Sequence, residues 1–326
     1  MKYLLTAALA TLLIGCAEAK TSDIVADVKD GVVYITNEVS PTQGGAGTGF
    51  IVNDNQIVTN LHVVEGPGKI SVYSDDSQRK YAATIVYKDP VADIAVLRLQ
   101  DWELFEKNET PVNLALGRSD AMNLGDRVIV IGHPWGLTWT VSEGIVSGKD
   151  RRPGQNPRFL FQVDANLFQG NSGGPIFNDR GQVICVSTLM LAMEGGSYGF
   201  CVPSDLVEKV LYDFNTFGEI HWRVLNVSAG LTEDGSSVIL EDVEAGGAAD
   251  KAGIKKGDKI VSIQTPHNVP NGVKITSPND MITELAKLKG DEENVRVLID
   301  RNGELMMIDV KTNFRLSKEY TPDQAK

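Results

Sequence analysis

The chain has 326 residues, of which 42% are hydrophobic and 23% charged, a composition that fits about two or three globular domains and excludes a wholly disordered protein. Its formal net charge of -12 disfavours contact with phosphate backbones, so nucleic acid is not an expected partner. The 3 cysteines and 4 histidines are scattered and form no CxxC pair, so neither a metal site nor a cofactor is predicted.

The N-terminus has the pattern of a lipoprotein signal peptide over residues 1–15. Lys2 precedes a short apolar run, Leu4 to Ile14, which is too short for a permanent membrane-spanning helix. The run ends at Leu13-Ile14-Gly15-Cys16, which resembles a bacterial lipobox whose cysteine is acylated. The alternative is a plain secretory signal with an incidental Cys16. Because Ala17 is not aspartate, we expect a lipid anchor on the periplasmic side of the envelope, in the outer membrane rather than the inner one.

A linker at 16–30 leads into a long β-rich region, expected to span residues 31–214. Short segments typical of strands alternate there with Gly, Pro, Asn and Asp turns, which indicates a barrel or sandwich. Helical periodicity is evident only at residues 203–214, and a hinge is expected at 215–223. The expected strands are 31–37, 49–52, 56–59, 69–73, 82–88, 94–99, 127–131 and 138–147.

A second unit is expected at 224–313, followed by a polar tail at 314–326. It combines strands at 237–243, 259–264, 294–300 and 305–311 with a helix at 279–287. The turn Asp300-Arg301-Asn302-Gly303 is a strong hairpin signal between the last two strands. This unit is therefore predicted to be a small α+β domain.

The stretch Gly170-Asn171-Ser172-Gly173-Gly174-Pro175 places one hydroxyl among glycines. Glycines allow positive φ angles, so that consecutive N–H groups can converge on one point. Such donors stabilise the oxyanion formed when a serine attacks a carbonyl group. An ordinary Gly/Asn/Ser turn closed by Pro175 is the alternative for this stretch taken alone.

A serine nucleophile requires a base and a group that orients the base. His62 directly follows a predicted strand, and Asp93 precedes the apolar strand 94–99, where an unpaired aspartate would be costly. His133 lies in a Gly/Pro loop and is better interpreted as a loop or pocket-lining residue. The order His62, Asp93, Ser172 is that of the chymotrypsin arrangement.

Three blocks, TNLHVV, DPVADIAVLRL and GNSGGP, resemble the HtrA (high-temperature-requirement A) family of trypsin-like serine proteases, as do GTGFIV at 47–52 and YGFCVPSDLVEKV at 198–210. The resemblance implies a mostly β protein with a chymotrypsin-like double β-barrel protease domain. It assigns His62 as general base, Asp93 as its orienting group and Ser172 as nucleophile. Gly170 and Ser172 would supply the oxyanion-hole N–H groups. A degenerate, inactive protease is the alternative.

The sequence departs from the family directly before Gly170, at Leu167-Phe168-Gln169, where a proline or arginine beside small residues is usual. This loop shapes the primary specificity pocket in the family. The uncharged Asn166 argues against a preference for Lys or Arg, so we expect a small or medium apolar P1 residue. The predicted pocket consists of Asn166, Leu167, Phe168, Thr188 and Leu191.

Cys185 and Cys201 remain once Cys16 is assigned to the lipid anchor. Both lie in segments typical of strands, and an oxidising compartment would allow them to form a disulfide. Two buried free thiols are the equally weighted alternative.

The second unit resembles a PDZ domain through VILEDVEAGGAADKAGIKKGDKIVSIQ at 238–264. Within it, Gly253 is expected to end a short helix in the left-handed conformation. PDZ domains bind C-terminal peptides by adding a strand to a sheet edge. The carboxylate loop would be Trp222-Arg223-Val224-Leu225, although the usual glycine is missing. A PDZ fold that serves only as a spacer is the alternative.

Together these resemblances imply a serine endopeptidase (EC 3.4.21 class) that acts on misfolded or regulatory proteins through an acyl-enzyme. The alternative is a PDZ-dependent chaperone or stress sensor with latent or lost proteolysis. Relatives assemble as trimers through N-terminal residues that are often aromatic, and residues 21–29 contain none. A homotrimer is nevertheless expected, and the short segment 36–47 argues against a larger cage.

Overall fold

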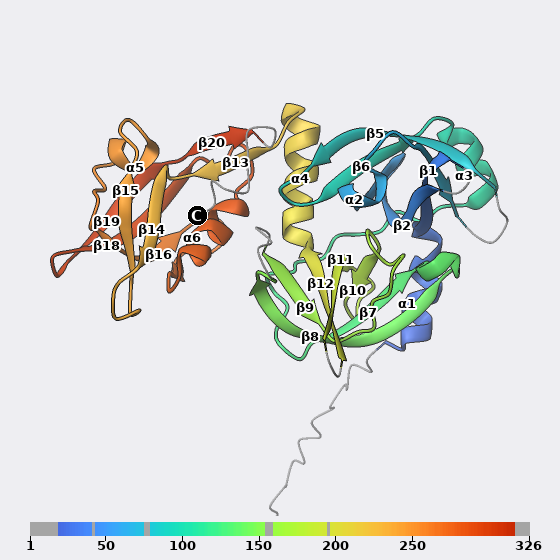
Figure 1. Ribbon diagram of the computed structural model, residues 1–326, viewed down its shortest axis with the longest axis horizontal. Helices are drawn as coiled ribbons and strands as arrows, with labels where there is room; N and C mark the ends of the chain where they lie inside the picture. The colour runs from blue at the N-terminus through green and yellow to red at the C-terminus, as the bar shows by residue number, and fades with distance from the viewer. Residues whose placement is uncertain (1–18, 41–42, 75–78, 154–158, 194–195, 317–326) are drawn as a thin grey trace, which may run out of the picture.

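Two β-barrels and a third, separate β-rich domain follow one another along the chain (Figure 1). The computed structural model describes residues 19–40, 43–74, 79–153, 159–193 and 196–316. The expected fold class, a mostly β double barrel followed by a small α+β domain, is confirmed. Cys16 lies outside the described residues, and among the helices described none is both long and apolar enough to cross a membrane.

The first barrel is antiparallel and closes in the order β1-β2-β3-β6-β5-β4. Its strand β6 is buried on both faces, with alternate residues entering two different cores, Ile94 and Val96 into one and Ala95 and Leu97 into the other. This explains the continuous apolar run in the sequence. The strands are β1 (Val32–Ser40), β2 (Gln43–Asn53), β3 (Gln56–Asn60), β4 (Lys69–Tyr73), β5 (Tyr81–Asp89) and β6 (Ile94–Leu99).

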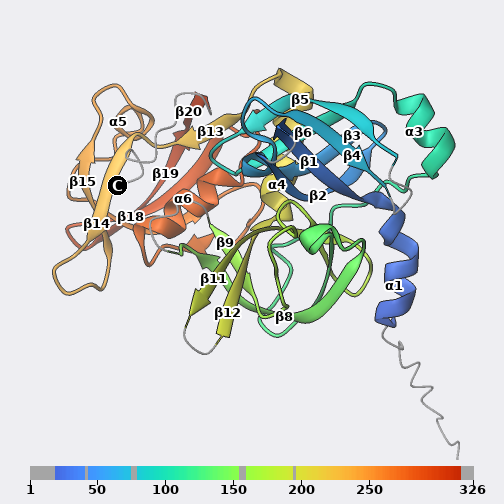
Figure 2. The same cartoon turned by 45° about the vertical axis from the view of Figure 1, so that its right-hand side comes forward.

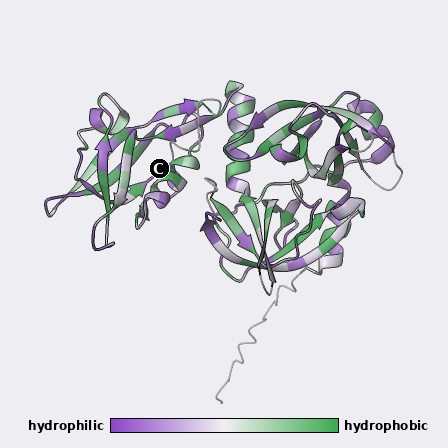
Figure 3. Cartoon of the chain, viewed as in Figure 1, coloured by the Kyte–Doolittle hydropathy of each residue, from purple (hydrophilic) through white to green (hydrophobic). Residues whose placement is uncertain are grey.

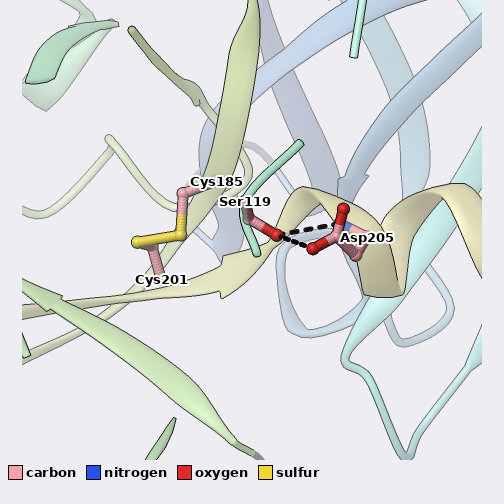
Figure 4. Close-up of a disulfide and its surroundings, with 4 residues drawn as sticks. All are labelled: Ser119, Cys185, Cys201 and Asp205. Atoms are coloured by element: carbon pink, nitrogen blue, oxygen red, sulfur yellow. Dashed lines mark hydrogen bonds between the residues drawn. A yellow bond between two sulfur atoms is a disulfide. The ribbon is translucent and has the colours of Figure 1, made fainter. Parts of the chain in front are cut away.

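The second barrel closes in the order β10-β11-β12-β9-β8-β7. A disulfide joins Cys185 of β11 to Cys201 of β12, with 5.6 Å between their Cα atoms, and both side chains are buried (Figure 4). The structure therefore contains the paired form of the two alternatives. The strands are β7 (Arg127–Gly132), β8 (Thr140–Arg151), β9 (Leu160–Val163), β10 (Pro175–Phe177), β11 (Val183–Met193) and β12 (Gly196–Pro203).

The barrels share one apolar core that holds the segments between them in place. Phe50 and Val58 of the first barrel belong to the same buried cluster as Ile129 and Phe177 of the second. The nucleophile-like stretch 170–175 connects to this seam, since the Thr48 N–H of β2 donates to the Ser172 carbonyl oxygen at 2.9 Å. The seam is where a site made of residues from both barrels can form.

Helices occur at more places than the expected 203–214. The helices α1 (Thr21–Val28), α2 (Leu61–Val64) and α3 (Trp102–Glu109) lie within predicted linker or loop segments, so that part of the prediction was wrong. In α1, Ile24 and Val28 are four positions apart and pack into the shared core. The side chain of Asp101 caps α3 by accepting the Leu104 N–H at 3.0 Å. Helices this short provide too few turns for a clear period.

The helix α4 (Ser204–Phe217) connects the barrels to the third domain (Figure 2). Its first turn is bonded to the segment that precedes β7, because the Ser119 hydroxyl donates to Asp205 Oδ2 at 2.6 Å (Figure 4). The Asp205 N–H in turn donates to Ser119 Oγ at 3.1 Å. The helix ends at Gly218 with a φ of 77°, so the predicted hinge at 215–223 is half helix.

The third domain is built on a six-stranded sheet in the order β14-β15-β16-β18-β19, with β17 paired to β16. Its buried apolar residues form a core of their own, and Figure 3 shows hydrophobic residues in green along its strands. As expected, Gly253 adopts a positive φ of 81°, and a hairpin turn at Asn302-Gly303 joins β18 to β19. The strands are β14 (Val227–Leu231), β15 (Val238–Val243), β16 (Lys259–Gln264), β17 (Val273–Lys274), β18 (Asn294–Arg301) and β19 (Glu304–Lys311).

Two further strands and two helices complete this domain. The strand β13 (His221–Val224) pairs with β20 (Asn313–Leu316), so the first residues of the predicted polar tail are in a strand. The helix α6 (Pro278–Ala286) begins with a capping box formed by Ser277 and Asp280, and α5 is short (Ala248–Lys251). The strand β14 is at the edge of the sheet, and α6 packs beside it. The free edge of β14 could therefore pair with one more strand next to this helix.

Candidate active site

His62 and Asp93 form a directly bonded pair at the seam of the barrels. His62 Nδ1 lies 2.8 Å from Asp93 Oδ2, and the His62 backbone N–H donates to Asp93 Oδ1 at 3.1 Å. The aspartate is buried, whereas 46% of the histidine side chain is exposed. A carboxylate at Nδ1 fixes the proton on that nitrogen, which leaves Nε2 as the unprotonated, accessible base.

The position of Asp93 is fixed by its backbone as well as by its carboxylate. Its φ of 58° is in the left-handed region, which is uncommon for a residue other than glycine. The Asp93 carbonyl oxygen accepts the Leu61 N–H at 3.0 Å and the Asn60 side-chain amide at 2.9 Å. The Thr188 hydroxyl donates to Asp93 Oδ2 at 2.9 Å. Loop geometry and three donors therefore hold the carboxylate beside His62.

Ser172 lies between the two barrels with its hydroxyl turned toward β11. Ser172 Oγ donates to the Thr188 carbonyl oxygen at 3.5 Å, and among the described residues no hydrogen bond joins it to His62. Long hydrogen bonds of this kind are common at serine nucleophiles without substrate. Thr188 bonds to the serine through its carbonyl oxygen and to Asp93 through its hydroxyl, so it connects the serine to the acid–base pair. The serine hydroxyl must turn away from Thr188 before it can donate to His62.

The N–H groups of Gly170 and Ser172 are available as donors, since no acceptor is found for either in the described part of the chain. Gly170 has a φ of 105°, and a Cβ atom at this position would approach the His133 carbonyl oxygen to 2.8 Å. Only glycine satisfies both conditions. The two free N–H groups flank the serine, as stabilisation of an oxyanion requires.

The residues predicted for the specificity pocket differ in where they lie. Leu167 is 3% exposed and belongs to the core of the second barrel, while Asn166 is exposed and its carbonyl oxygen accepts the Ser142 hydroxyl at 2.8 Å. Phe168 is 39% exposed and Leu191 is 36% exposed. Thr188, predicted as a wall residue, is instead bonded to the carboxylate of the acid–base pair.

Trp135 is a site residue that the sequence did not single out. It lies in the short turn η2 (Pro134–Gly136) with a φ of 51°, and its ring centroid is 5.4 Å from that of Phe168. The side chain is 67% exposed. A large apolar residue held in an unfavourable backbone conformation beside Gly170 is the type of feature that accompanies functional sites. The Gly132-His133-Pro134 loop was the available signal; His133 itself is buried, against Tyr34.

A second candidate site lies between the edge strand β14 and the helix α6. The groove has a volume of about 340 Å³ and opens along the unpaired edge of β14. Its charged lining residues are Arg223 on β13, Arg315 on β20, Asp242 on β15 and Glu244 directly after β15. A groove between a sheet edge and a helix can accept an extended peptide as an added strand. Its apolar lining residues include Leu225, Val227, Met281, Ile282 and Leu285.

The four residues predicted for the carboxylate loop are not all in this groove. Arg223, Val224 and Leu225 line it, but Trp222 packs in the shared core of the barrels, with Lys209 Nζ 5.0 Å from its ring centroid. Arg223 is 4% exposed and donates to the Gly290 carbonyl oxygen, while its Nε atom has no hydrogen-bond partner among the described residues. Burial lowers the pKa of this guanidinium, and Glu293 and Asp213 oppose the shift.

A buried ion pair links the groove's domain to the barrels. Lys209 Nζ of α4 donates to Asp213 Oδ2 at 2.6 Å, and both side chains are 0% exposed. The Gly290 N–H of the third domain donates to Asp213 Oδ1 at 2.6 Å, and the His221 N–H donates to Oδ2 at 3.1 Å. A Cβ atom at Gly290 would approach Phe217 to 2.5 Å, so the loop fits closely only with glycine. We refer to Lys209, Asp213, Arg223 and Gly290 as the domain joint.

Comparisons with protein families match both parts of the chain. Residues 47–186 match the model of the trypsin-like peptidase domain, and residues 225–299 match that of the PDZ domain. The first match runs from within β2 to within β11, and the second runs from the residues before β14 into β18 and includes α6.

Curated relatives include proteins named as probable periplasmic serine endoprotease DegP-like. The one from Chlamydia pneumoniae is 35% identical over 279 residues, which is 81% of this chain and 54% of that protein. The chain thus spans about half the length of the curated relatives it matches.

Solved structures of HtrA-type proteases have the same fold over nearly the whole chain. One is the HtrA-type protease AlgW with tripeptide, which is 25% identical with a TM-score of 0.69 and covers 90% of this chain and 97% of that chain. Another is the serine endoprotease from Yersinia pestis, which is 27% identical with a TM-score of 0.62 and covers 92% of this chain and 99% of that chain.

Proposed function

The chain belongs to the HtrA family, with a trypsin-like peptidase domain followed by one PDZ domain, and on this basis we propose that it is a serine endopeptidase of the cell envelope. The observation that supports the proposal is the His62–Asp93 pair, which shares Thr188 with Ser172, together with two backbone N–H groups, of Gly170 and Ser172, that have no acceptor among the described residues. The curated relatives are named periplasmic endoproteases, which supports a periplasmic location.

The proposed reaction begins when the Ser172 hydroxyl turns from the Thr188 carbonyl oxygen toward His62 Nε2. His62 takes the hydroxyl proton as Ser172 Oγ bonds to the substrate carbonyl carbon, and the carbonyl oxygen becomes an oxyanion. The N–H groups of Gly170 and Ser172 stabilise that charge, each contributing about 10²–10³-fold to kcat. Asp93 stabilises the imidazolium without taking its proton.

Collapse of this intermediate breaks the C–N bond, and His62 donates its proton to the departing amine. The acyl group remains on Ser172 Oγ as an ester. Water then donates a proton to His62 Nε2 and attacks the ester carbon, and His62 returns the proton to Ser172 Oγ as the acid product leaves. Misfolded or regulatory proteins are the proposed substrates, because an extended chain presents its backbone to such a seam.

We propose that the groove between β14 and α6 binds the C-termini of proteins and that the domain joint transmits its occupancy to the barrels. The free edge of β14 and the apolar side chains of Met281, Ile282 and Leu285 support the binding of an extended peptide with an apolar last residue. Arg223 lines this groove and also donates to Gly290 in the domain joint. A residue shared by both features supports a regulatory role for the PDZ domain.

A PDZ-dependent chaperone or sensor with latent proteolysis is the second candidate function. The observation that favours it is the Ser172 hydroxyl bonded to Thr188 rather than to His62. In that case the groove binds unfolded chains, and the barrels cleave them only after a conformational change, or not at all.

Digestion of denatured β-casein by the wild type and by Ser172→Ala separates the two functions. The endopeptidase predicts that mass spectrometry finds new peptide termini with the wild type and a loss of at least about 10⁴-fold in rate with the variant. Equal cleavage by both proteins would contradict the assignment of Ser172. Suppressed aggregation of the casein, without cleavage by either protein, would favour the chaperone.

We further propose that Cys16 carries the lipid anchor and that the mature protein is a homotrimer. The intact mass of protein purified from membranes tests the anchor, since removal of residues 1–15 and acylation of Cys16 change the mass in a defined way. Sedimentation equilibrium of a soluble form that begins after Cys16 tests the trimer. A monomeric mass at all protein concentrations would contradict it.

A further inference from the structure

Thr48 of the first barrel makes two hydrogen bonds to the nucleophile loop, residues 170–175. It belongs to β2 and is 0% exposed. Its N–H donates to the Ser172 carbonyl oxygen at 2.9 Å, and its hydroxyl donates to the Gly170 carbonyl oxygen at 2.7 Å. A single side chain and its backbone thus bond to the carbonyl groups on both sides of Asn171.

The Thr48 hydroxyl has both of its hydrogen-bonding roles filled. While it donates to Gly170, its oxygen accepts the His133 N–H at 3.0 Å. The Thr48 carbonyl oxygen separately accepts the Thr59 hydroxyl at 2.7 Å. These partners fix the direction of the hydroxyl, which therefore acts as an oriented donor.

The direction of each oxyanion-hole donor is set by the carbonyl group that precedes it. Because a trans peptide unit is planar, the Gly170 N–H points away from the Gln169 carbonyl oxygen, and the Ser172 N–H points away from that of Asn171. Both carbonyl oxygens are bonded, that of Gln169 to the Trp135 N–H at 3.3 Å and that of Asn171 to the Gly174 N–H at 2.9 Å. The two donors are thereby directed away from the protein's own acceptors.

Gly170 is the weak point of this arrangement. Its φ of 105° is not enforced by a side chain, and glycine reaches other conformations at little cost. The peptide unit before Gly170 is held by Trp135. In the unit after it, the Gly170 carbonyl oxygen accepts the Thr48 hydroxyl at 2.7 Å and the Asn171 N–H donates to the Phe168 carbonyl oxygen at 3.0 Å. Without that hydroxyl, the Gly170 carbonyl group loses its own partner, and the peptide unit after Gly170 keeps only the bond from Asn171 within the same loop.

We propose that Thr48 is a positioning residue of the oxyanion hole, acting through the Gly170 carbonyl group. The proposal rests on the proposed endopeptidase function. Thr48 does not touch the reacting atoms, so its hydroxyl affects the stabilisation of the oxyanion and leaves the binding of the substrate's ground state largely unchanged. This role predicts an effect on kcat without a matching effect on KM.

The substitution Thr48→Val tests the hydroxyl alone. Valine has the shape of threonine and keeps the N–H bond to Ser172, but it removes both bonds of the hydroxyl, the one to the Gly170 carbonyl oxygen and the one from the His133 N–H. Thr48→Ser restores a hydroxyl, and Thr48→Ala provides a second side chain without one. Thr312→Val is the matched control, because Thr312 is 3% exposed and its hydroxyl donates to a distant carbonyl oxygen, that of Glu293, at 2.8 Å.

The assay measures kcat and KM with a quenched-fluorescent peptide built on a β-casein cleavage site, in proteins whose near-UV circular dichroism matches the wild type. We expect kcat to fall about 10–100-fold in Thr48→Val and Thr48→Ala, with KM within about twofold. Thr48→Ser should stay within about threefold of wild type, and Thr312→Val should equal it.

A folded Thr48→Val or Thr48→Ala variant with wild-type kcat would overturn the role of Thr48 and leave the endopeptidase intact. A loss in KM alone, or a loss that Thr48→Ser does not restore, would overturn it as well. Failure of the wild type to cleave the peptide, with Ser172→Ala no different, would instead overturn the proposed function.

Discussion

Two loops of this molecule, for which we propose binding of an anion through backbone N–H groups, are held in different ways. The nucleophile loop depends on Gly170, which has no side chain and is fixed from outside by Thr48 and Trp135. The turn beside the PDZ groove depends on Asn226, whose φ of 61° is left-handed and whose side chain donates to Glu244 and accepts from Asn313. The loop at Gly170 is held by bonds that other residues make to its backbone, whereas the loop at Asn226 is held by bonds that its own side chain makes.

The loops also differ in how they connect to the rest of the protein. The nucleophile loop lies on the shared core of the barrels, where its neighbours are fixed. The groove is connected through Arg223 to Gly290, and through Gly290 to the buried carboxylate of Asp213 in α4. The groove is therefore connected to the barrels through charged side chains, whereas the nucleophile loop is supported by apolar packing.

Replacing Asp213 by alanine should have the largest effect. Burial already lowers the pKa of Lys209, and Asp213 opposes that shift, so the variant leaves a buried ammonium without its counter-charge. Loss of one partner of such a pair costs about 3–5 kcal/mol of unfolding free energy. Urea unfolding followed by tryptophan fluorescence measures it. Asp291→Ala is the control: it removes the exposed hydrogen bond from Tyr212 and a more distant attraction to Arg223, and it should cost under about 1 kcal/mol. If Asp213→Ala and Asp291→Ala lost the same unfolding free energy, the buried ion pair of the domain joint would not be an important source of stability.

Replacing Gly170 by alanine should lower kcat about 10²–10³-fold and also lower the free energy of unfolding by about 1–2 kcal/mol or more. The added Cβ atom meets the His133 carbonyl oxygen at a φ that alanine rarely adopts, so the loop must turn and its N–H leaves the oxyanion. Steady-state kinetics with the casein-derived peptide provide the measurement. Gly218→Ala, also at positive φ but with open space around it, controls for the loss of a glycine. A Gly170→Ala enzyme with wild-type kcat would show that this loop does not need its glycine.

The Asn226 loop should behave differently under the matched pair Asn226→Gly and Asn226→Ala. Glycine adopts the left-handed conformation freely and should keep the free energy of unfolding within about 0.5 kcal/mol of wild type, whereas alanine should lower it by about 1–2 kcal/mol. Calorimetry of unfolding, with titration of a peptide ending in an apolar residue, reports both stability and binding. If glycine were as harmful as alanine, the side-chain bonds rather than the conformation would hold the turn.

The smallest effect is expected at His267, which supports the Gly290 loop through Glu292. The hydrogen bond with Glu292, 2.8 Å from His267 Nε2, raises the pKa of His267 against the opposing effect of its partial burial. A raised pKa stabilises the fold below the unfolded value of about 6.5, and the contribution is lost as the pH rises through the folded value. Because the ring is 36% exposed, we expect under about 1 kcal/mol. Urea unfolding of wild type and His267→Gln at about pH 6 and pH 9 should give a difference only at the lower pH; the opposite sign would contradict the pairing.

The parts of the site that lie in short motifs were predictable from the sequence. His62, Asp93 and Ser172 each follow or precede a strand in a recognisable block, and the fold class followed from the same blocks. Thr48 was not predictable, because its bond to Gly170 joins residues 122 positions apart and depends on how two barrels close. The helix α1 was missed because two buried residues give no visible period, and only the shared core shows why they are apolar.

The PDZ part shows the same limit in a different form. Val224 and Leu225 were placed next to the groove because the loop pattern is local. Trp222 was assigned to that loop as well, yet it packs among the barrels, since β13 bridges the domains and turns alternate side chains to opposite sides. Sequence spacing gave no information about which domain would bury it.

The most direct test of the account is labelling of the wild-type protein with a fluorophosphonate, which bonds to a serine only when a base and oxyanion donors surround it. Intact mass and peptide mapping identify the modified residue, and the matched Ser172→Ala variant is treated in parallel. We predict a single adduct on Ser172 of the wild type and none on the variant. An unmodified wild type, or an adduct on another residue that persists in Ser172→Ala, would contradict the claim that His62, Asp93, Gly170 and Ser172 form a working catalytic site.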